Sequence, residues 1–229
     1  MREDICTIPI SEAFEDTTGC PICRMKKTVE NRILDYIMGA AMMEPDVRIE
    51  TNRLGFCQTH LGEMMNRRGR LSLALMLESQ TKDLYNNLFK SGVLTSFQKK
   101  GEKANNFNRS CFVCDKINWG FERMINTIFL TYENDRDFRE IFSKQDFFCL
   151  EHYSLLATKA NKKVLRKYYS EFNKDLEAAC SSYLKVLCDD IEKYCSMYDY
   201  RNSGEKADWG NSKDSIERAA LFLTGFEAK

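Results

Sequence analysis

The feature that most constrains this chain is a Cys-x-x-Cys pair followed by a Cys-x-x-His pair, an arrangement that occurs twice. The intervening segment has 33 residues in the first occurrence and 34 in the second. The chain has only two histidines, and each lies three residues after a cysteine. Unrelated core cysteines would not repeat in this way, so we predict eight metal ligands. They are Cys20, Cys23, Cys57, His60, Cys111, Cys114, Cys149 and His152.

The similarity between the two halves extends beyond these ligands. Gly55-Phe56-Cys57 aligns with Phe147-Phe148-Cys149, and Arg32 aligns with Arg123. We therefore predict a tandem duplication of a helical unit. The expected divisions are a first metal-binding repeat, a linker, a second metal-binding repeat, and a loop with a C-terminal helix. Their ranges are 1–95, 96–109, 110–199 and 200–229.

The composition indicates an all-α fold with long packed helices. Only 3 Pro and 11 Gly interrupt a chain that is 43% hydrophobic. Each Cys-x-x-Cys is expected to begin a helix, over about 23–43 and 114–132, with apolar residues at helical spacing. Each Cys-x-x-His is expected to open a longer helix, over about 58–90 and 150–198, with Leu71 and Leu75 on the buried stripe of the first.

Local signals mark the ends of several shorter helices. Pro45 suits a first helical position and Asp135 suits a cap. A final helix over 214–224 is expected to begin with a capping box, formed by Asp214 and Glu217, and to stop at Gly225.

Three thiolates and one imidazole suit Zn²⁺, and four protein ligands close its coordination sphere. We therefore expect two structural zinc ions, each bound within its own repeat. The return segment Glu44 to Phe56 could span about 40 Å if extended, enough to bring the chain back along a 20-residue helix. An iron–sulfur cluster is the main alternative, followed by a labile redox thiol pair and by buried cysteines without metal.

Other cysteines and one tryptophan fall outside this pattern. Cys180, Cys188 and Cys195 lie at intervals of eight and seven, and a buried helical seam is preferred to a third metal site. Cys6 stands alone. Trp209 lies in a polar segment, where it either anchors a partner or packs back on the helices.

Charge and hydropathy exclude several classes of protein. Lys+Arg and Asp+Glu balance at 34 each, so no nucleic-acid partner is expected. No apolar run is long enough for a membrane span, and the first residues do not resemble a signal peptide. We therefore expect a cytoplasmic protein with reduced thiols.

Several stretches together resemble an uncharacterised family of bacterial proteins, common in anaerobic Gram-positive bacteria. They are IPISEAF, CPIC, MMEPDVRIETNRLGFCQTH, FFCLEH and ERAALFLTG. The resemblance covers nearly the whole chain and implies that the eight cysteine and histidine residues are family features. It implies no activity.

These observations favour a non-enzymatic zinc protein that acts as an interaction or adaptor scaffold in a bacterial cytosol, with a protein partner or a small ligand. One alternative is a redox or metal sensor that uses the Cys₃His sites. Another is an enzyme with a pocket between the repeats, although the sequence contains none of the common catalytic motifs.

Overall fold

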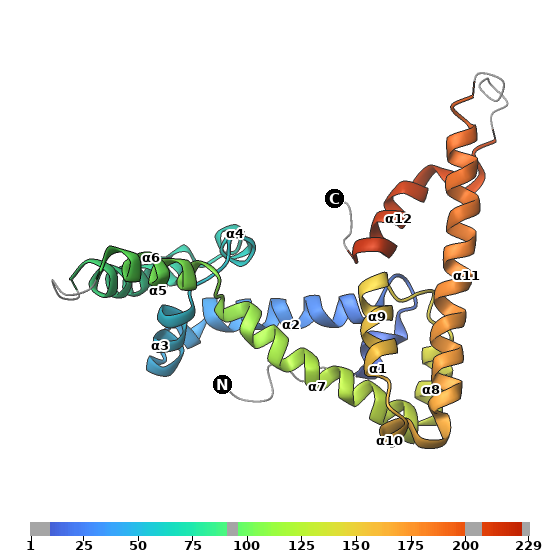
Figure 1. Cartoon of the computed structure of the whole chain (residues 1–229), viewed down its shortest axis with the longest axis horizontal. Helices are drawn as coiled ribbons and strands as arrows, with labels where there is room; N and C mark the ends of the chain where they lie inside the picture. Colours follow the sequence, from blue (N-terminus) through green and yellow to red (C-terminus); the bar gives the residue numbers. More distant parts are fainter. Residues whose placement is uncertain (1–9, 91–95, 200–207, 226–229) are drawn as a thin grey trace. The chain divides into compact units, whose positions relative to one another are not determined.

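A computed structural model describes residues 10–90, 96–199 and 208–225, and these residues form helices and connecting loops with no strand among them (Figure 1). The predicted all-α class is therefore confirmed. The α-helices are α1 (Ile10–Glu15), α2 (Pro21–Met38), α3 (Pro45–Leu54), α4 (Gln58–Asn66), α5 (Arg70–Tyr85), α6 (Phe97–Asn108), α7 (Phe112–Asn134), α8 (Arg136–Ser143), α9 (Leu150–Lys159), α10 (Lys162–Leu165), α11 (Tyr169–Ser196) and α12 (Ser215–Thr224). Shorter turns are η2 (Ala40–Met43), η3 (Asn86–Lys90), η4 (Arg166–Tyr168) and η5 (Gly210–Asp214).

The chain divides into two compact units. Among the residues that the structure describes, unit 1 comprises those of Lys26–Arg123, and unit 2 comprises residues 10–25 with residues 124–199 and 208–225. The boundaries fall inside helices α2 and α7, which have 18 and 23 residues. At 1.5 Å per residue these helices are about 27 and 35 Å long. The expected division into repeats with a linker at 96–109, and the duplication itself, stay predictions.

The segment predicted as a linker, residues 96–109, is helical over Phe97–Asn108, and its role as a linker stays a prediction. Ser96 caps helix α6, because its hydroxyl accepts a hydrogen bond from the amide of Lys99. At the other end of α6 the Phe107 ring packs against Gly55 of the same unit. A polar composition therefore marked an exposed helix rather than a loop.

The two helices predicted after the Cys-x-x-His pairs are both interrupted. Gly69, at φ +102°, separates α4 from α5. Asn161, whose side chain accepts from the amide of Lys163, begins a new helix after α9. Each break resets the helical phase, so a stripe extrapolated across it fails. Leu71 is accordingly 72% exposed, and Leu73 and Met76 form the buried face of α5.

Most predicted helix ends are confirmed. Pro45 occupies the first turn of α3, and the Asp135 carboxylate accepts hydrogen bonds from the amides of Asp137 and Phe138 at the start of α8. Gly225 ends α12 in the left-handed conformation at φ +69°. The predicted capping box is wrong, because the Asp214 carboxylate accepts from Arg218 and caps no amide.

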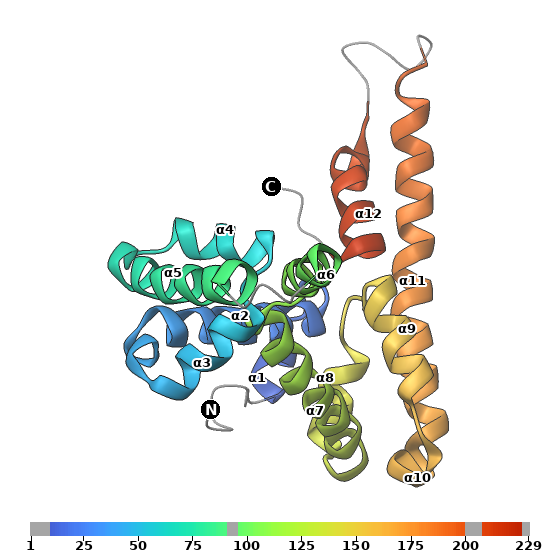
Figure 2. The same ribbon diagram turned by 60° about the vertical axis from the view of Figure 1, so that its left-hand side comes forward.

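The core of unit 1 is aliphatic. The buried stripe of α2 contributes Val29, Ile33 and Ile37, as its periodicity predicted, and all three are fully buried. Helix α5 packs on α3 in both views of the ribbon (Figure 1 and Figure 2).

The core of unit 2 is aromatic. Phe142 of α8 lies at its centre, with ring centroids 4.9 Å from Phe148 and 5.0 Å from Phe172. Each such pair stabilises the fold by about 0.5–1.5 kcal/mol beyond simple burial. Phe148 directly precedes Cys149, so this core fixes the start of α9, which lies beside α11 in both views (Figure 1 and Figure 2).

The remaining cysteines and Trp209 have different environments. Cys180 is buried, and its thiol donates to the carbonyl of Phe148, but Cys188 and Cys195 are exposed. The predicted buried seam is therefore wrong for the last two, because α11 has neighbours along only part of that side. Trp209 packs on Tyr194 and Tyr198 near the end of α11. Cys6 and residues 200–207 lie outside the described residues.

None of the described helices combines the length and apolarity needed to cross a bilayer.

Candidate metal centres

All four halves of the motif have the same local geometry at a helix start. Cys57 and Cys149 are the N-cap residues of α4 and α9, and Cys20 and Cys111 directly precede α2 and α7. The carbonyl of each of these cysteines accepts a hydrogen bond from the amide four residues later, at 2.8–3.3 Å. The second member of every pair is therefore the third residue of the helix. Side chains at the N-cap and third positions lie next to each other, as in a capping box.

This placement also favours thiolates. The first turn of a helix carries unpaired amide N–H groups and the positive end of the helix dipole. Four helix starts thus direct partial positive charge at the cysteines, which lowers the cost of deprotonating them.

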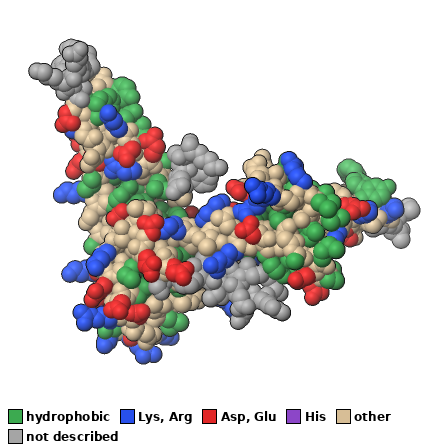
Figure 3. All heavy atoms as spheres, turned by 180° about the vertical axis from the view of Figure 1, so that it is seen from behind, with side chains coloured by type: hydrophobic (Ala, Val, Ile, Leu, Met, Phe, Trp, Pro, Cys, Tyr) green, Lys and Arg blue, Asp and Glu red, His purple; other side chains and the backbone are tan. Residues whose placement is uncertain are grey.

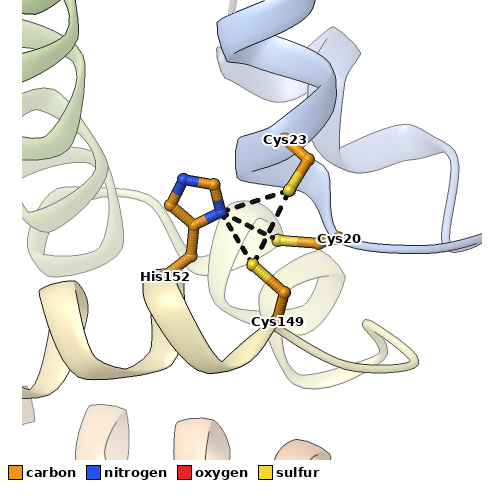
Figure 4. A group of neighbouring side chains, drawn as sticks. All are labelled: Cys20, Cys23, Cys149 and His152. Atoms are coloured by element: carbon orange, nitrogen blue, oxygen red, sulfur yellow. Dashed lines mark hydrogen bonds between the residues drawn. The ribbon is translucent and has the colours of Figure 1, made fainter. Parts of the chain in front are cut away.

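In unit 2 the first Cys-x-x-Cys pair meets the second Cys-x-x-His pair (Figure 4). His152 Nδ1 lies 3.5 Å from Cys20 Sγ, 3.3 Å from Cys23 Sγ and 3.1 Å from Cys149 Sγ. The sulfurs of Cys23 and Cys149 are 3.7 Å apart. Cys20, Cys149 and His152 are buried, and Cys23 is half-buried.

In unit 1 the second Cys-x-x-Cys pair meets the first Cys-x-x-His pair. His60 Nδ1 lies 3.3 Å from the sulfurs of Cys57 and Cys111 and 3.4 Å from that of Cys114. The sulfurs of Cys57 and Cys114 are 3.9 Å apart. His60 and Cys111 are buried, whereas Cys57 and Cys114 are half-buried.

The eight predicted residues therefore come together in two groups of four, but the predicted pairing within each repeat is wrong. Cys20 and Cys23 join Cys149 and His152, and not Cys57 and His60. The physical reason lies in the return segment. The segment from Glu44 to Phe56 could return along α2 only if it were extended, but Pro45–Leu54 is a helix of 10 residues and advances only about 15 Å. The chain therefore does not come back along α2 to the pair at its start.

Both groups fit a single tetrahedral ion. With Zn–S near 2.3 Å and Zn–N near 2.05 Å, a tetrahedron places two sulfurs about 3.8 Å apart and a sulfur and a nitrogen about 3.6 Å apart. The sulfur–sulfur distances of 3.7 and 3.9 Å match the first value. The sulfur–nitrogen distances of 3.1–3.5 Å are all shorter than the second value. Each group could thus hold one metal ion with little movement.

The cysteine thiols within these groups differ in pKa. Burial opposes ionisation of Cys20, but hydrogen bonds from Cys149 and Cys23 lower its pKa to about 3. The pKa of Cys23 is raised in turn, first by its hydrogen bonds to Cys149 and Cys20. In unit 1, burial also opposes ionisation of Cys111, but a hydrogen bond from His60 lowers its pKa to about 6. A divalent ion that binds all four groups must displace the remaining protons.

Glu30 of α2 holds the imidazole of the unit 1 group. Its Oε1 lies 3.1 Å from His60 Nε2, on the opposite side of the ring from the sulfurs. The hydrogen bond from His60 and the nearby Lys27 ammonium hold the pKa of Glu30 at about 2. Burial would lower the pKa of His60, but its contacts with Cys111 and Glu30 raise it to about 10. Such a carboxylate would orient the ring so that Nδ1 is available to a bound metal ion.

Gly225 lies against the sulfurs of the unit 2 group. A Cβ at this position would lie 3.0 Å from Cys23 Sγ and 3.2 Å from Cys149 Sγ, at a φ that already favours glycine. The last turn of α12 therefore covers the cluster with backbone alone. The sequence predicts Gly225 only as a helix stop and gives no signal for Glu30. The local pattern around either residue does not point to a histidine or a thiol that is distant in sequence.

A model of a family of unknown function, DUF6062, matches residues 1–229. The chain belongs to this family. The expected resemblance to an uncharacterised family is thereby confirmed, and membership brings no activity with it. No match was found among curated proteins or among solved structures.

The crossed pairing can be tested with two matched double variants. Cys20→Ser with His152→Asn damages one group, whereas Cys20→Ser with His60→Asn damages both. We expect elemental analysis to find one metal ion retained in the first variant and none in the second. The reverse result would restore pairing within each repeat. Both variants remove the same residue types, so a general loss of thiol and imidazole cannot explain a difference.

The role of Glu30 can be tested with Glu30→Gln. Loss of an outer carboxylate typically weakens metal binding about 10- to 100-fold. We expect that loss at the unit 1 group alone, measured by competition with a chelator. Glu63→Gln is the control, because Glu63 also contacts Lys27 but not His60. Equal chelator resistance of the two variants would contradict this role.

Proposed function

We propose that this chain is a non-enzymatic zinc protein in which each Cys₃His group holds one structural Zn²⁺ ion. The observation that carries the proposal is that four ligand atoms in each group lie within 4.8 Å of one another. Four protein ligands complete a tetrahedron and leave no position for water or substrate, which is typical of structural and not of catalytic zinc.

Geometry also favours a single ion over an iron–sulfur cluster. A cluster interposes several irons and inorganic sulfides between its ligands and holds them further apart than one ion does. The ligand atoms of each group lie within 4.8 Å of one another, which is close enough for them to share one ion.

The role of the zinc-held units, in this proposal, is to present helical surfaces to a protein partner or small ligand in a bacterial cytosol, where thiols stay reduced. Exposed aromatic side chains support an interaction role. Tyr85 and Phe89 are 54% and 66% exposed and pack on each other, and Phe97 is 93% exposed. Figure 3 shows hydrophobic side chains gathered at the end of unit 1 that is formed by α5 and α6. Elsewhere on that face, acidic and basic side chains are interspersed, which does not favour a nucleic-acid partner.

Protein purified without oxygen tests the metal assignment directly. We expect two zinc ions per chain by elemental analysis and no visible absorption band. Cys57→Ser should lose one zinc ion and unfold at a lower temperature, because zinc binding contributes to folding free energy. Cys188→Ser, at an exposed position outside both groups, should keep both ions and the original Tm. Iron with acid-labile sulfide would contradict the proposal.

A redox sensor is a second candidate, and the exposure of the unit 1 group favours it. Two of its three thiols, Cys57 and Cys114, are half-buried and their sulfurs are 3.9 Å apart. Hydrogen peroxide accepts two electrons from two thiolates, which form one disulfide while two hydroxide ions and the zinc ion leave.

Mild peroxide should therefore release zinc from unit 1 before unit 2. A colorimetric zinc indicator would follow release from Cys149→Ser, which retains only the unit 1 site, and from Cys57→Ser, which retains only the unit 2 site. We expect faster release from Cys149→Ser, and recovery of zinc binding after reduction. Retention of zinc by both variants would exclude the sensor.

A further inference from the structure

Unit 1 contains a groove of about 670 Å³ between α3, α6 and the end of α5 with η3. This volume lies within the range of small-molecule sites, about 300–1,000 Å³. Its apolar lining comes from Ile49, Leu54, Leu84, Leu88 and Phe107. The groove thus offers an apolar surface that the helices of the unit do not cover.

The wide turn of η3 brings polar and apolar groups into the groove together. η3 is a π-helical turn, and its Asn87 and Leu88 both line the groove. Asn87 also donates to the Asp83 carboxylate at 3.0 Å, which satisfies one oxygen of the only acidic side chain in the lining. Such turns are rare and often occur at functional sites.

Two cations in the lining are available to a ligand. Arg53 and Lys103 make no hydrogen bond or ion pair with any residue that the structure describes, and both are exposed. The nearby Glu50 carboxylate is paired with Lys116 at 2.8 Å, and Arg53 lowers the pKa of Glu50 only through its charge, without an ion pair. With Asp83 as the one acid, the groove carries a net positive charge beside an apolar wall.

The groove is fixed by the same segments that lead into the metal group of unit 1. The Ser110 hydroxyl donates to the carbonyl of Leu54, and the amide of Phe112 donates to the carbonyl of Gly55. A Cβ at Gly55 would lie 2.7 Å from Phe107 Cζ, so only glycine allows that ring to close the groove. The segments continue directly to Cys57 and Cys111, so the metal group ties together two walls of the groove.

We propose that this groove binds a small amphipathic carboxylate, a molecule with an apolar body and one anionic head. The apolar body would lie on the Leu84, Leu88 and Phe107 side chains. Arg53 and Lys103 would receive the head, since a guanidinium pairs with a carboxylate through two hydrogen bonds. The proposal extends the scaffold role to a defined ligand class and does not depend on which metal fills the Cys₃His group.

The experiment uses a matched series of eight-carbon compounds with the metal-loaded full chain. Isothermal titration should show that octanoate binds more tightly than octanol, and octylamine least. The double variant Arg53→Gln with Lys103→Gln should weaken octanoate binding about tenfold, since it removes both cations that pair with the carboxylate head and exposed ion pairs contribute modestly. It should leave octanol binding unchanged.

The control is Arg68→Gln with Arg70→Gln, which removes the same charge from exposed positions outside the groove lining. It should bind octanoate as the original chain does. Leu84→Asp should abolish binding of octanoate while both metal ions remain bound. Equal affinity for the three compounds, no binding of octanoate, or equal losses in the two double variants would each overturn the proposal. Metal content, measured on the same samples, reports separately on the zinc proposal.

Discussion

The structure depends on contacts between helix starts that are far apart in the chain. Each Cys₃His group joins the N-cap and third residue of one helix to those of another. The polar starts of helices would otherwise need solvent or capping side chains for their amides. In this protein the helix starts lie beside cysteine thiols. The partial positive charge of each helix start favours the thiolate form, which is the form that binds a cation. One local geometry, used four times, therefore accounts for the spacing of the motif and for the helix starts.

The ligands could be predicted from the sequence because they follow a local rule, but their pairing could not. Spacing of three residues places two side chains on one face of a helix start whatever the tertiary fold. Which two pairs meet depends on the path between them. An extended segment between α2 and Cys57 would allow pairing within the first repeat, but the helix over Pro45–Leu54 shortens this segment. The helix breaks at Gly69 and Asn161 have a related cause. Glycine and asparagine also occur inside continuous helices, so tertiary packing decides whether such a residue ends the helix.

Glu30 and Gly225 could not be predicted as parts of the site for the same reason, because their roles depend on tertiary contacts. Glu30 lies on α2 within a run of charged residues and looks like part of a solvated face. Only the tertiary contact between His60 and α2 gives it a role. Gly225 was identified as a helix stop, and its second constraint, the close approach of two sulfurs, arises from α12 packing in unit 2. Residues that act on a site through tertiary packing carry no local signal.

Crossed pairing also means that the two units must close chain loops of different length when they fold. The metal group of unit 1 joins residues 51–57 positions apart, whereas that of unit 2 joins residues 126–132 apart. Closing the longer loop costs only about 0.8 kcal/mol more on chain entropy alone. Connectivity matters more, because Lys26–Arg123 of unit 1 lies between the two segments of unit 2 along the chain. Once unit 1 has folded, α2 and α7 leave it at fixed points, so unit 2 closes a much shorter effective loop. The order of the segments therefore favours unit 1 as the first to fold, and a metal ion bound there would assist assembly of the second site without touching it.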